Sequence, residues 1–312
     1  MKRKFGARYA RLAAFLLLAA VSAYGVSVFF FGDWREALLY WRRGGSVVAI
    51  VIVLRLLDLF LDAAIWYRVQ WDFGARLPWR QGFLAYMSVY AGLLLPAQLG
   101  RVVRADAIVR LGAGGFRGAI TAELALMVLS GIAALALLAG AITYVAVPWL
   151  VPLATAVVVF AMLFFFDWVT VLLPKKLAAI PRTYWRRPAT FLMAALITVG
   201  WMLVGTSFYM VVRDLPGNLQ LWQAWIIAPA NLVLGAGTGL PGGIGAVEAL
   251  LGVSLSILEV PPAHMAFAVG AFRLLTFWIW IPLGWIALLW VNRIARRRAR
   301  DAATSGEVGD AS

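Results

Sequence analysis

The feature that most constrains this sequence is a series of apolar segments long enough to cross a lipid bilayer. A helix needs about 20 predominantly apolar residues to span the hydrocarbon core. The chain of 312 residues is 63% hydrophobic, with a mean hydropathy of +0.88, which is more than a soluble core requires. We therefore predict an all-α polytopic membrane protein with about six transmembrane helices. Six segments have the required length: 10–31, 46–67, 118–140, 148–173, 189–212 and 264–290.

Two further apolar stretches are interrupted by proline and glycine. The first runs over 82–112 and is broken at 95–100, and the second runs over 222–258 and is broken at 240–245. Proline removes a backbone donor and glycine loosens a helix, so each stretch is predicted to form two half-helices. Broken backbone is tolerated at membrane depth only where protein or a wet cavity covers it. We therefore expect two re-entrant helical hairpins whose tips meet near mid-membrane and line a cavity.

The sequence also contains an internal repeat. A shift of about 145 residues places 91–102 over 236–247, where Ala-Gly, Leu-Pro and Gly-x-Val recur at the same spacing. The same shift superposes the three spans of one half on those of the other. Three crossings per half is an odd number, so the half-repeats, about 10–140 and 148–290, would have opposite orientations. Broken helices at equivalent positions of such an inverted-topology repeat mark the substrate site.

The net charge of +14 gathers at the ends of the apolar segments. This is the positive-inside pattern of a membrane protein rather than a nucleic-acid-binding surface, so we expect no nucleic-acid partner. We place a single membrane domain at 1–292 and a basic, disordered cytoplasmic tail at 293–312. Both termini would be cytoplasmic, in a bacterial or archaeal inner membrane. The basic clusters flanking the spans are Lys2, Arg3, Lys4, Arg8 and Arg11; Arg68, Arg76 and Arg80; Lys175, Lys176, Arg182, Arg186 and Arg187; and Arg293, Arg296, Arg297, Arg298 and Arg300.

Residues suited to catalysis are scarce. The chain has no cysteine, and its only histidine is His264. A thiolate or poly-histidine metal site is therefore excluded, and a lipid phosphatase would need two histidines. The sequence has no P-loop either. We expect neither enzymatic activity nor a cofactor.

Arginines at the first break are the leading candidates for binding a phosphate group. Arg101 lies at the break and Arg104 follows one helical turn later. Charges inside a membrane are costly and usually functional or paired, and a guanidinium matches a lipid phosphate well. We expect Arg104, with Arg101, to neutralise a phosphate beside the broken backbone at Pro96 and Gly100. The alternative is that this half-helix leaves the membrane early and both arginines are ordinary cytoplasmic charges.

The second break carries an acidic residue within an apolar half-helix. Glu248 could pair with Arg273 of the last span, either as a structural salt bridge or as a pair that opens with substrate or proton. The other expected substrate-binding residues at this break are Pro241, Gly242, Gly243 and Gly245.

Charges also lie on span 46–67. Arg55, Asp58 and Asp62 share one helix face, at positions i, i+3 and i+7. They would form either an internal charge ladder that locks this helix to a neighbour or a proton relay. Glu123, near one end of its span, is expected to pair with a basic residue of the first hairpin.

At these motifs the sequence resembles the lysylphosphatidylglycerol synthase transmembrane domain family, also called flippase-like domain proteins. The resemblance covers about 46–292. Two departures are Arg101, where members often have Asp or Glu, and Leu124, where they often have Arg. The motifs that carry the resemblance are Leu95-Pro96-x-x-x-Gly100-x-x-x-Arg104, and Leu240-Pro241-Gly242-Gly243-Ile244-Gly245-x-x-Glu248 followed by Arg273.

The resemblance implies a lipid flippase that moves an anionic or aminoacylated phospholipid of the phosphatidylglycerol type between leaflets. The expected partners are membrane lipids, and a lipid-modifying or glycosyltransferase partner and a homodimer both stay open. One alternative is a carrier of polyprenyl phosphate, with or without sugar, for cell-envelope glycan synthesis. Another is a membrane scaffold for a partner enzyme that transports nothing itself.

Overall fold

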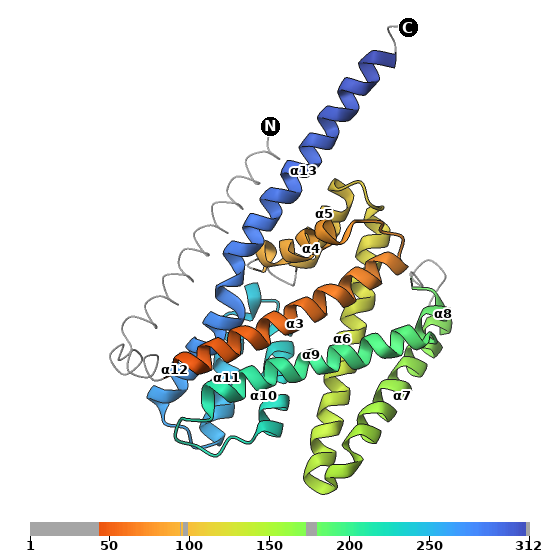
Figure 1. The fold of residues 1–312 in the computed structure, drawn as a ribbon. Coiled ribbons are helices and arrows are strands. Elements are labelled where there is room, and N and C mark those ends of the chain that lie inside the picture. Colours follow the sequence, from red (N-terminus) through yellow and green to blue (C-terminus); the bar gives the residue numbers. More distant parts are fainter. Residues whose placement is uncertain (1–43, 94, 96–98, 173–179, 310–312) are drawn as a thin grey trace, which may run out of the picture.

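The computed structural model describes residues 44–93, 95, 99–172 and 180–309 as helices joined by short turns (Figure 1). The first predicted span and Pro96 lie outside the described residues. The described elements are α3 (Gly45–Asp72), α4 (Trp79–Met87), η1 (Ser88–Gly92), α5 (Gly100–Arg110), α6 (Phe116–Ala146), η3 (Pro148–Leu150), α7 (Val151–Leu172), α8 (Arg182–Trp185), α9 (Pro188–Val212), α10 (Leu221–Gly237), η4 (Pro241–Gly243), α11 (Ala246–Ile257), α12 (Pro262–Arg273), the π-helical turn η5 (Leu274–Trp278) and α13 (Trp280–Gly309).

The predicted fold class is confirmed for the described part of the chain, which is all-helical. Four helices there are long and apolar enough to cross a membrane: Phe116–Ala146, Pro148–Val169, Pro188–Val212 and His264–Asp301. The 28-residue helix α3 covers another predicted span, although charged side chains interrupt its apolar sequence.

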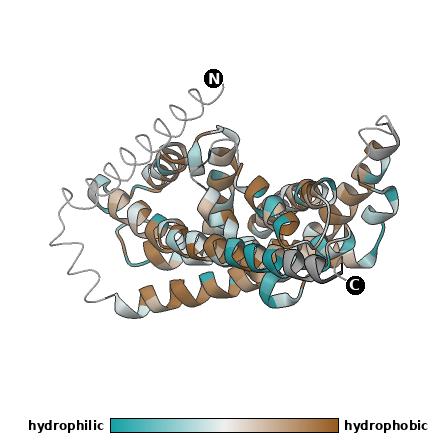
Figure 2. Ribbon diagram, turned by 90° about the horizontal axis from the view of Figure 1, so that it is seen from above, coloured by the Kyte–Doolittle hydropathy of each residue, from teal (hydrophilic) through white to brown (hydrophobic). Residues whose placement is uncertain are grey.

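Large apolar side chains on the outer surface fit a lipid environment. Helix α7 exposes a row of them, including Val157, Phe160 and Phe164 at 55%, 68% and 61%. Figure 2 shows hydrophobic residues along the helices on the outside of the molecule. A continuous apolar surface of this kind is unfavourable in water and favourable against acyl chains. The structure is therefore that of a multi-pass membrane protein.

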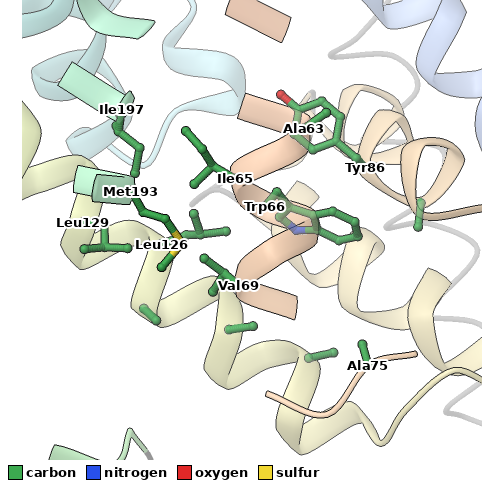
Figure 3. Packing of buried hydrophobic residues seen from close by; sticks show 14 of the residues in the cluster. Ala63, Ile65, Trp66, Val69, Ala75, Tyr86, Leu126, Leu129, Met193 and Ile197 are labelled. Atoms are coloured by element: carbon green, nitrogen blue, oxygen red, sulfur yellow. The ribbon is translucent and has the colours of Figure 1, made fainter. Parts of the chain in front are cut away.

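Two clusters of buried apolar residues hold the helices together. The larger lies among α3, α4, α6 and α9 and is built around Trp66, Tyr86 and Leu126 (Figure 3). The smaller joins α3 and α9 to the second broken segment and α12, around Phe208 and Leu251. Each broken segment is thus packed against one cluster.

Both broken segments fold back on themselves as hairpins. A Cβ on Gly92 would lie only 2.6 Å from Gly100 Cα, so the two arms of the first hairpin touch through backbone. In the second hairpin, Gly235 leaves room for Val247 in the same way. A Cβ on Gly242 would lie 3.3 Å from the carbonyl oxygen of residue 93, so the two tips meet. Gly242 has a φ of +58°, a conformation that glycine adopts at little cost.

The order of elements repeats between the two halves. The 145-residue shift carries α3 onto α9, α4 onto α10, α5 onto α11, and α6 onto the span formed by α12 and α13. The equivalent helices α3 and α9 pack side by side and run in opposite directions (Figure 1). Opposed equivalent helices are the arrangement expected of an inverted repeat.

The expectation of a disordered tail from residue 293 is wrong up to Gly309, because α13 continues as a helix to that residue. Arginine and alanine, which dominate the sequence here, are strong helix formers, and extending an existing helix needs no new nucleus. The extension is also attached to the first hairpin. Arg298 donates hydrogen bonds to the Leu111 carbonyl oxygen and, at 2.9 Å, to Gln81 Oε1.

Candidate functional site

A cavity of about 500 Å³ lies between the two hairpins, α3, α6 and α9. Apolar residues and glycines from both hairpin tips form part of its wall. Its polar lining brings together residues that are distant in sequence: Arg55, Asp58, Asp62, Tyr86, Tyr90, Arg101, Arg104, Ser130, Arg273 and Thr276.

Glu123 of α6 is the centre of the most buried polar cluster. Its side chain is 1% exposed, and Arg104 of α5 donates from Nη2 to its Oε2 at 2.7 Å. Arg101 Nη1 lies 3.6 Å from the same oxygen. The other oxygen, Oε1, accepts hydrogen bonds from Trp66 Nε1 at 2.6 Å and Gln70 Nε2 at 3.3 Å. The expected pairing of Glu123 with the first hairpin is confirmed, and it ties α3 and α5 to α6.

The guanidinium of Arg104 is held between two aromatic rings and one carboxylate. Its Cζ lies 5.4 Å from the ring centroid of Trp66 and 5.2 Å from that of Tyr86. The residue is 5% exposed, so it is not an ordinary surface charge. Within the described part of the chain, its Nε has no hydrogen-bond partner. A buried guanidinium N–H without a partner is costly, and it can donate a hydrogen bond to a further oxygen ligand.

The charges of α3 are tied to the first hairpin by two tyrosines. Arg55 forms an ion pair with Asp58 and donates from Nη2 to Tyr90 Oη at 2.6 Å. Tyr86 Oη donates to Asp62 Oδ2 at 2.6 Å. The charge ladder that locks α3 to a neighbour is therefore present, and it also faces the cavity.

The pair of Glu248 and Arg273 holds the second hairpin tip to the last span. Arg273 Nε lies 2.7 Å from Glu248 Oε1, and its Nη2 donates to the Gly242 carbonyl oxygen at 3.0 Å. The other carboxylate oxygen accepts the Gly245 backbone N–H at 2.7 Å. Arg273 is 3% exposed, and its guanidinium lies 4.0 Å from the Phe277 ring centroid within η5. The predicted pair is confirmed as a structural contact.

The predicted site residues occupy three kinds of position. Glu123 and Glu248 are arginine partners outside the lining of the larger cavity, while Pro241 and Gly245 shape the second tip. Sequence reasoning missed Tyr86 and Tyr90, although two tyrosines four apart in an apolar half-helix were a usable signal. The predicted site residues that line the larger cavity are Arg55, Asp58, Asp62, Gly100, Arg101, Arg104, Gly242, Gly243 and Arg273.

A second cavity of about 410 Å³ adjoins the first between α5, α6 and the second hairpin tip. The two cavities share Arg101, Met127 and Ala236. Its remaining lining is mostly apolar: Leu99, Val102, Ile120, Leu124, Gly237 and Gly239, with Glu123. No group of three or more His, Cys, Asp or Glu residues in the described ranges is arranged to hold a metal ion.

Apolar helices and two broken segments in inverted order, arranged around a charged cavity, define a multi-pass membrane protein. The family model described as "Lysylphosphatidylglycerol synthase TM region" matches residues 10–284, and the chain belongs to this family. Membership indicates a membrane protein of lipid-related function. No curated protein matches the chain.

Proposed function

We propose that the protein is a flippase that moves an anionic or aminoacylated phospholipid of the phosphatidylglycerol type between leaflets. The observation that carries this proposal is the buried Arg104, which lines the cavity between the hairpins and whose Nε has no hydrogen-bond partner among the described residues. Guanidinium groups bind phosphate through short, charge-assisted hydrogen bonds. Multi-pass architecture and family membership support a lipid as the source of that phosphate.

The two arginines of the first hairpin would act in sequence. The side chain of Arg101 is 26% exposed and lies where the two cavities join, so it meets an entering phosphate first. Arg104 lies one turn deeper, with a side chain 6% exposed. Its charge is already balanced by Glu123, so a phosphate competes with that carboxylate rather than filling an empty charge site. Such competition permits binding without trapping the lipid.

The second cavity supplies a place for the acyl chains. Leu99 and Leu124 on its wall are 44% and 48% exposed. An apolar groove beside a charged cavity fits the two ends of a phospholipid, because the headgroup needs polar partners and the tails need none. In this proposal the tails stay in the bilayer beside α5 and α6 while the headgroup crosses between the hairpin tips.

Movement would depend on release of the second hairpin tip. Arg273 holds both Glu248 and the Gly242 carbonyl, so loss of these contacts frees a glycine-rich turn. The proposal includes no covalent chemistry and no cofactor. It places the protein in a bacterial or archaeal inner membrane with both termini cytoplasmic, following the positive-inside distribution of its arginines and lysines.

The test is lipid translocation in proteoliposomes with Arg104→Ala beside the wild type. Fluorescent phosphatidylglycerol, its lysyl ester and a polyprenyl phosphate serve as separate probes. We expect the wild type to accelerate translocation of phosphatidylglycerol or its lysyl ester. The translocation rate of Arg104→Ala should be lower by roughly tenfold or more, since a charge-assisted hydrogen bond contributes about 1.5–3 kcal/mol. The control is Arg213→Ala, which removes an arginine 40% exposed that pairs with Asp214 outside the cavity.

Each outcome separates the candidate functions. Faster translocation of the polyprenyl phosphate alone would indicate the alternative carrier function, with Arg104 binding the phosphate of that lipid. Equal rates for wild type and protein-free vesicles with every lipid would reject transport and favour the scaffold function. An equal loss of translocation rate in Arg104→Ala and Arg213→Ala would show that the effect of Arg104→Ala is not specific to the cavity.

A further inference from the structure

Opposite charges are balanced around the main cavity. Three arginine partnerships are present: Arg55 with Asp58, Arg104 and Arg101 with Glu123, and Arg273 with Glu248. The fourth carboxylate is Asp62. The cavity wall and its direct partners thus carry four arginines and four carboxylates, which sum to zero when all are ionised: Arg55, Arg101, Arg104, Arg273, Asp58, Asp62, Glu123 and Glu248.

Asp62 differs from the other three carboxylates. Within the described residues it makes no ion pair, and its hydrogen bond comes from the neutral hydroxyl of Tyr86 at 2.6 Å. It is partly buried and lines the cavity. The charged and titratable groups that act on it are Arg55 and Asp58 of α3, Tyr86 of α4, Tyr90 of η1, and Arg101 and Arg104 of α5.

An entering phosphate would disturb this balance. A phosphodiester headgroup without an amine carries one negative charge, so the occupied cavity would hold a net charge of −1. An uncompensated charge in a low-dielectric site is costly. Protonating Glu248 or Asp58 would leave a buried arginine without its partner, which is also costly. Both oxygens of Glu123 accept hydrogen bonds, so protonating Glu123 would lose at least one of them. Protonating Asp62 restores neutrality and breaks no ion pair.

We infer that Asp62 takes up one proton with each anionic headgroup, so that the protein is a lipid–proton symporter. The inference rests on the proposed flippase function. The carboxylate of Asp62 accepts a proton from water and becomes a neutral acid. Tyr86 can still donate to its carbonyl oxygen, and the new O–H is a donor that faces the cavity. On the far side the lipid leaves and the proton returns to water.

Symport of one anion with one proton moves no net charge. Translocation of phosphatidylglycerol should therefore respond to a pH gradient and not to a membrane voltage. At equilibrium the lipid should accumulate roughly tenfold per pH unit on the alkaline side, because one pH unit corresponds to about 1.4 kcal/mol per proton.

The experiment uses the full chain in proteoliposomes with fluorescent phosphatidylglycerol and a pH dye enclosed. A pH gradient and a potassium–valinomycin voltage are imposed separately. For the wild type we expect acceleration by the pH gradient alone and entry of one proton per lipid. Asp62→Asn keeps the side-chain shape without a titratable group, so its transport should lose the pH response and respond to voltage. Asp106→Asn is the matched control and should behave as wild type, because Asp106 pairs with Arg110 and is not part of the cavity lining.

The outcomes distinguish the two proposals. Wild-type phosphatidylglycerol movement that is indifferent to the pH gradient, with no dye signal, would overturn symport and leave the flippase standing. Absence of movement for any lipid would overturn both. If Asp62→Asn does not fold, the proton count and the voltage response of the wild type still decide the question.

Discussion

At the scale of single residues, Glu123 of α6 is the side chain that joins α3, α5 and α6. Its carboxylate forms ion pairs with two arginines of α5 and accepts hydrogen bonds from a tryptophan and a glutamine of α3. The side chain is almost fully buried. The carboxylate fixes the position of Arg104 and also competes for it. A buried ion pair of this kind adds little net stability, but removal of one partner leaves the other charge uncompensated.

Replacing Glu123 with Gln should therefore destabilise the protein by about 3–5 kcal/mol. Gln keeps the shape and can still accept from Trp66, so the loss isolates the charge. Thermal unfolding in detergent measures this change in stability. The control is Asp106→Asn, which breaks the exposed pair of Asp106 and Arg110 and should cost under about 1 kcal/mol.

Added phosphatidylglycerol should stabilise Glu123→Gln more than wild type, because a bound phosphate replaces the missing negative charge. Equal stabilisation of both proteins by the lipid would argue against a phosphate at Arg104.

At the scale of elements, close helix contacts depend on glycine. Gly284 of α13 lies directly against the backbone of η1, where a Cβ would collide with Ala91 N and would lie 2.6 Å from Tyr90 Cβ. This contact holds the first hairpin against the last span. Small residues at such positions let membrane helices approach closely, since packing replaces the hydrophobic effect as the driving force.

Gly284→Ala should destabilise the protein by about 1–3 kcal/mol through overpacking, measured by thermal unfolding. A Cβ added to Gly252 in α11 would meet nothing within 4 Å, so Gly252→Ala is the matched control and should be neutral or slightly stabilising. Similar melting temperatures for the two variants would contradict the assigned packing of α13 on η1.

At the scale of the whole molecule, the sequence was informative because a membrane allows few solutions. Apolar segments of sufficient length, two Pro-Gly breaks and the repeat gave the described spans and both hairpins. Charges such as Arg104, Glu248 and Arg273 stood out because they are costly in apolar segments. Tyr86 and Tyr90 did not, since aromatic residues are common in membrane helices, and their hydroxyl partners follow only from the packing of the first hairpin against α3. The helical extension of α13 was missed because its basic residues were interpreted as a disordered tail, although arginine and alanine favour a helix.

The inverted arrangement makes a prediction about sidedness. Arg80 and Arg300 should lie on one side of the membrane and Asn218 on the other, because the basic clusters belong in the cytoplasm. The chain has no cysteine, so single cysteines at these three exposed positions can be labelled in the native background. An impermeant thiol reagent added to intact cells should label only the cysteine at position 218. Labelling at position 80 from outside would exclude the proposed topology.

The π-helical turn η5 gives the last span a mechanical role. On one side of η5, Arg273 holds the second hairpin tip, and on the other side Gly284 and Arg298 hold the first hairpin. The last span therefore contacts both halves of the molecule, and the π-helical turn η5 lies between the two sets of contacts. Once Arg273 releases the second hairpin tip, bending or rotation at this turn would shift the two hairpins relative to each other. The last span would then connect the motions of the two repeats.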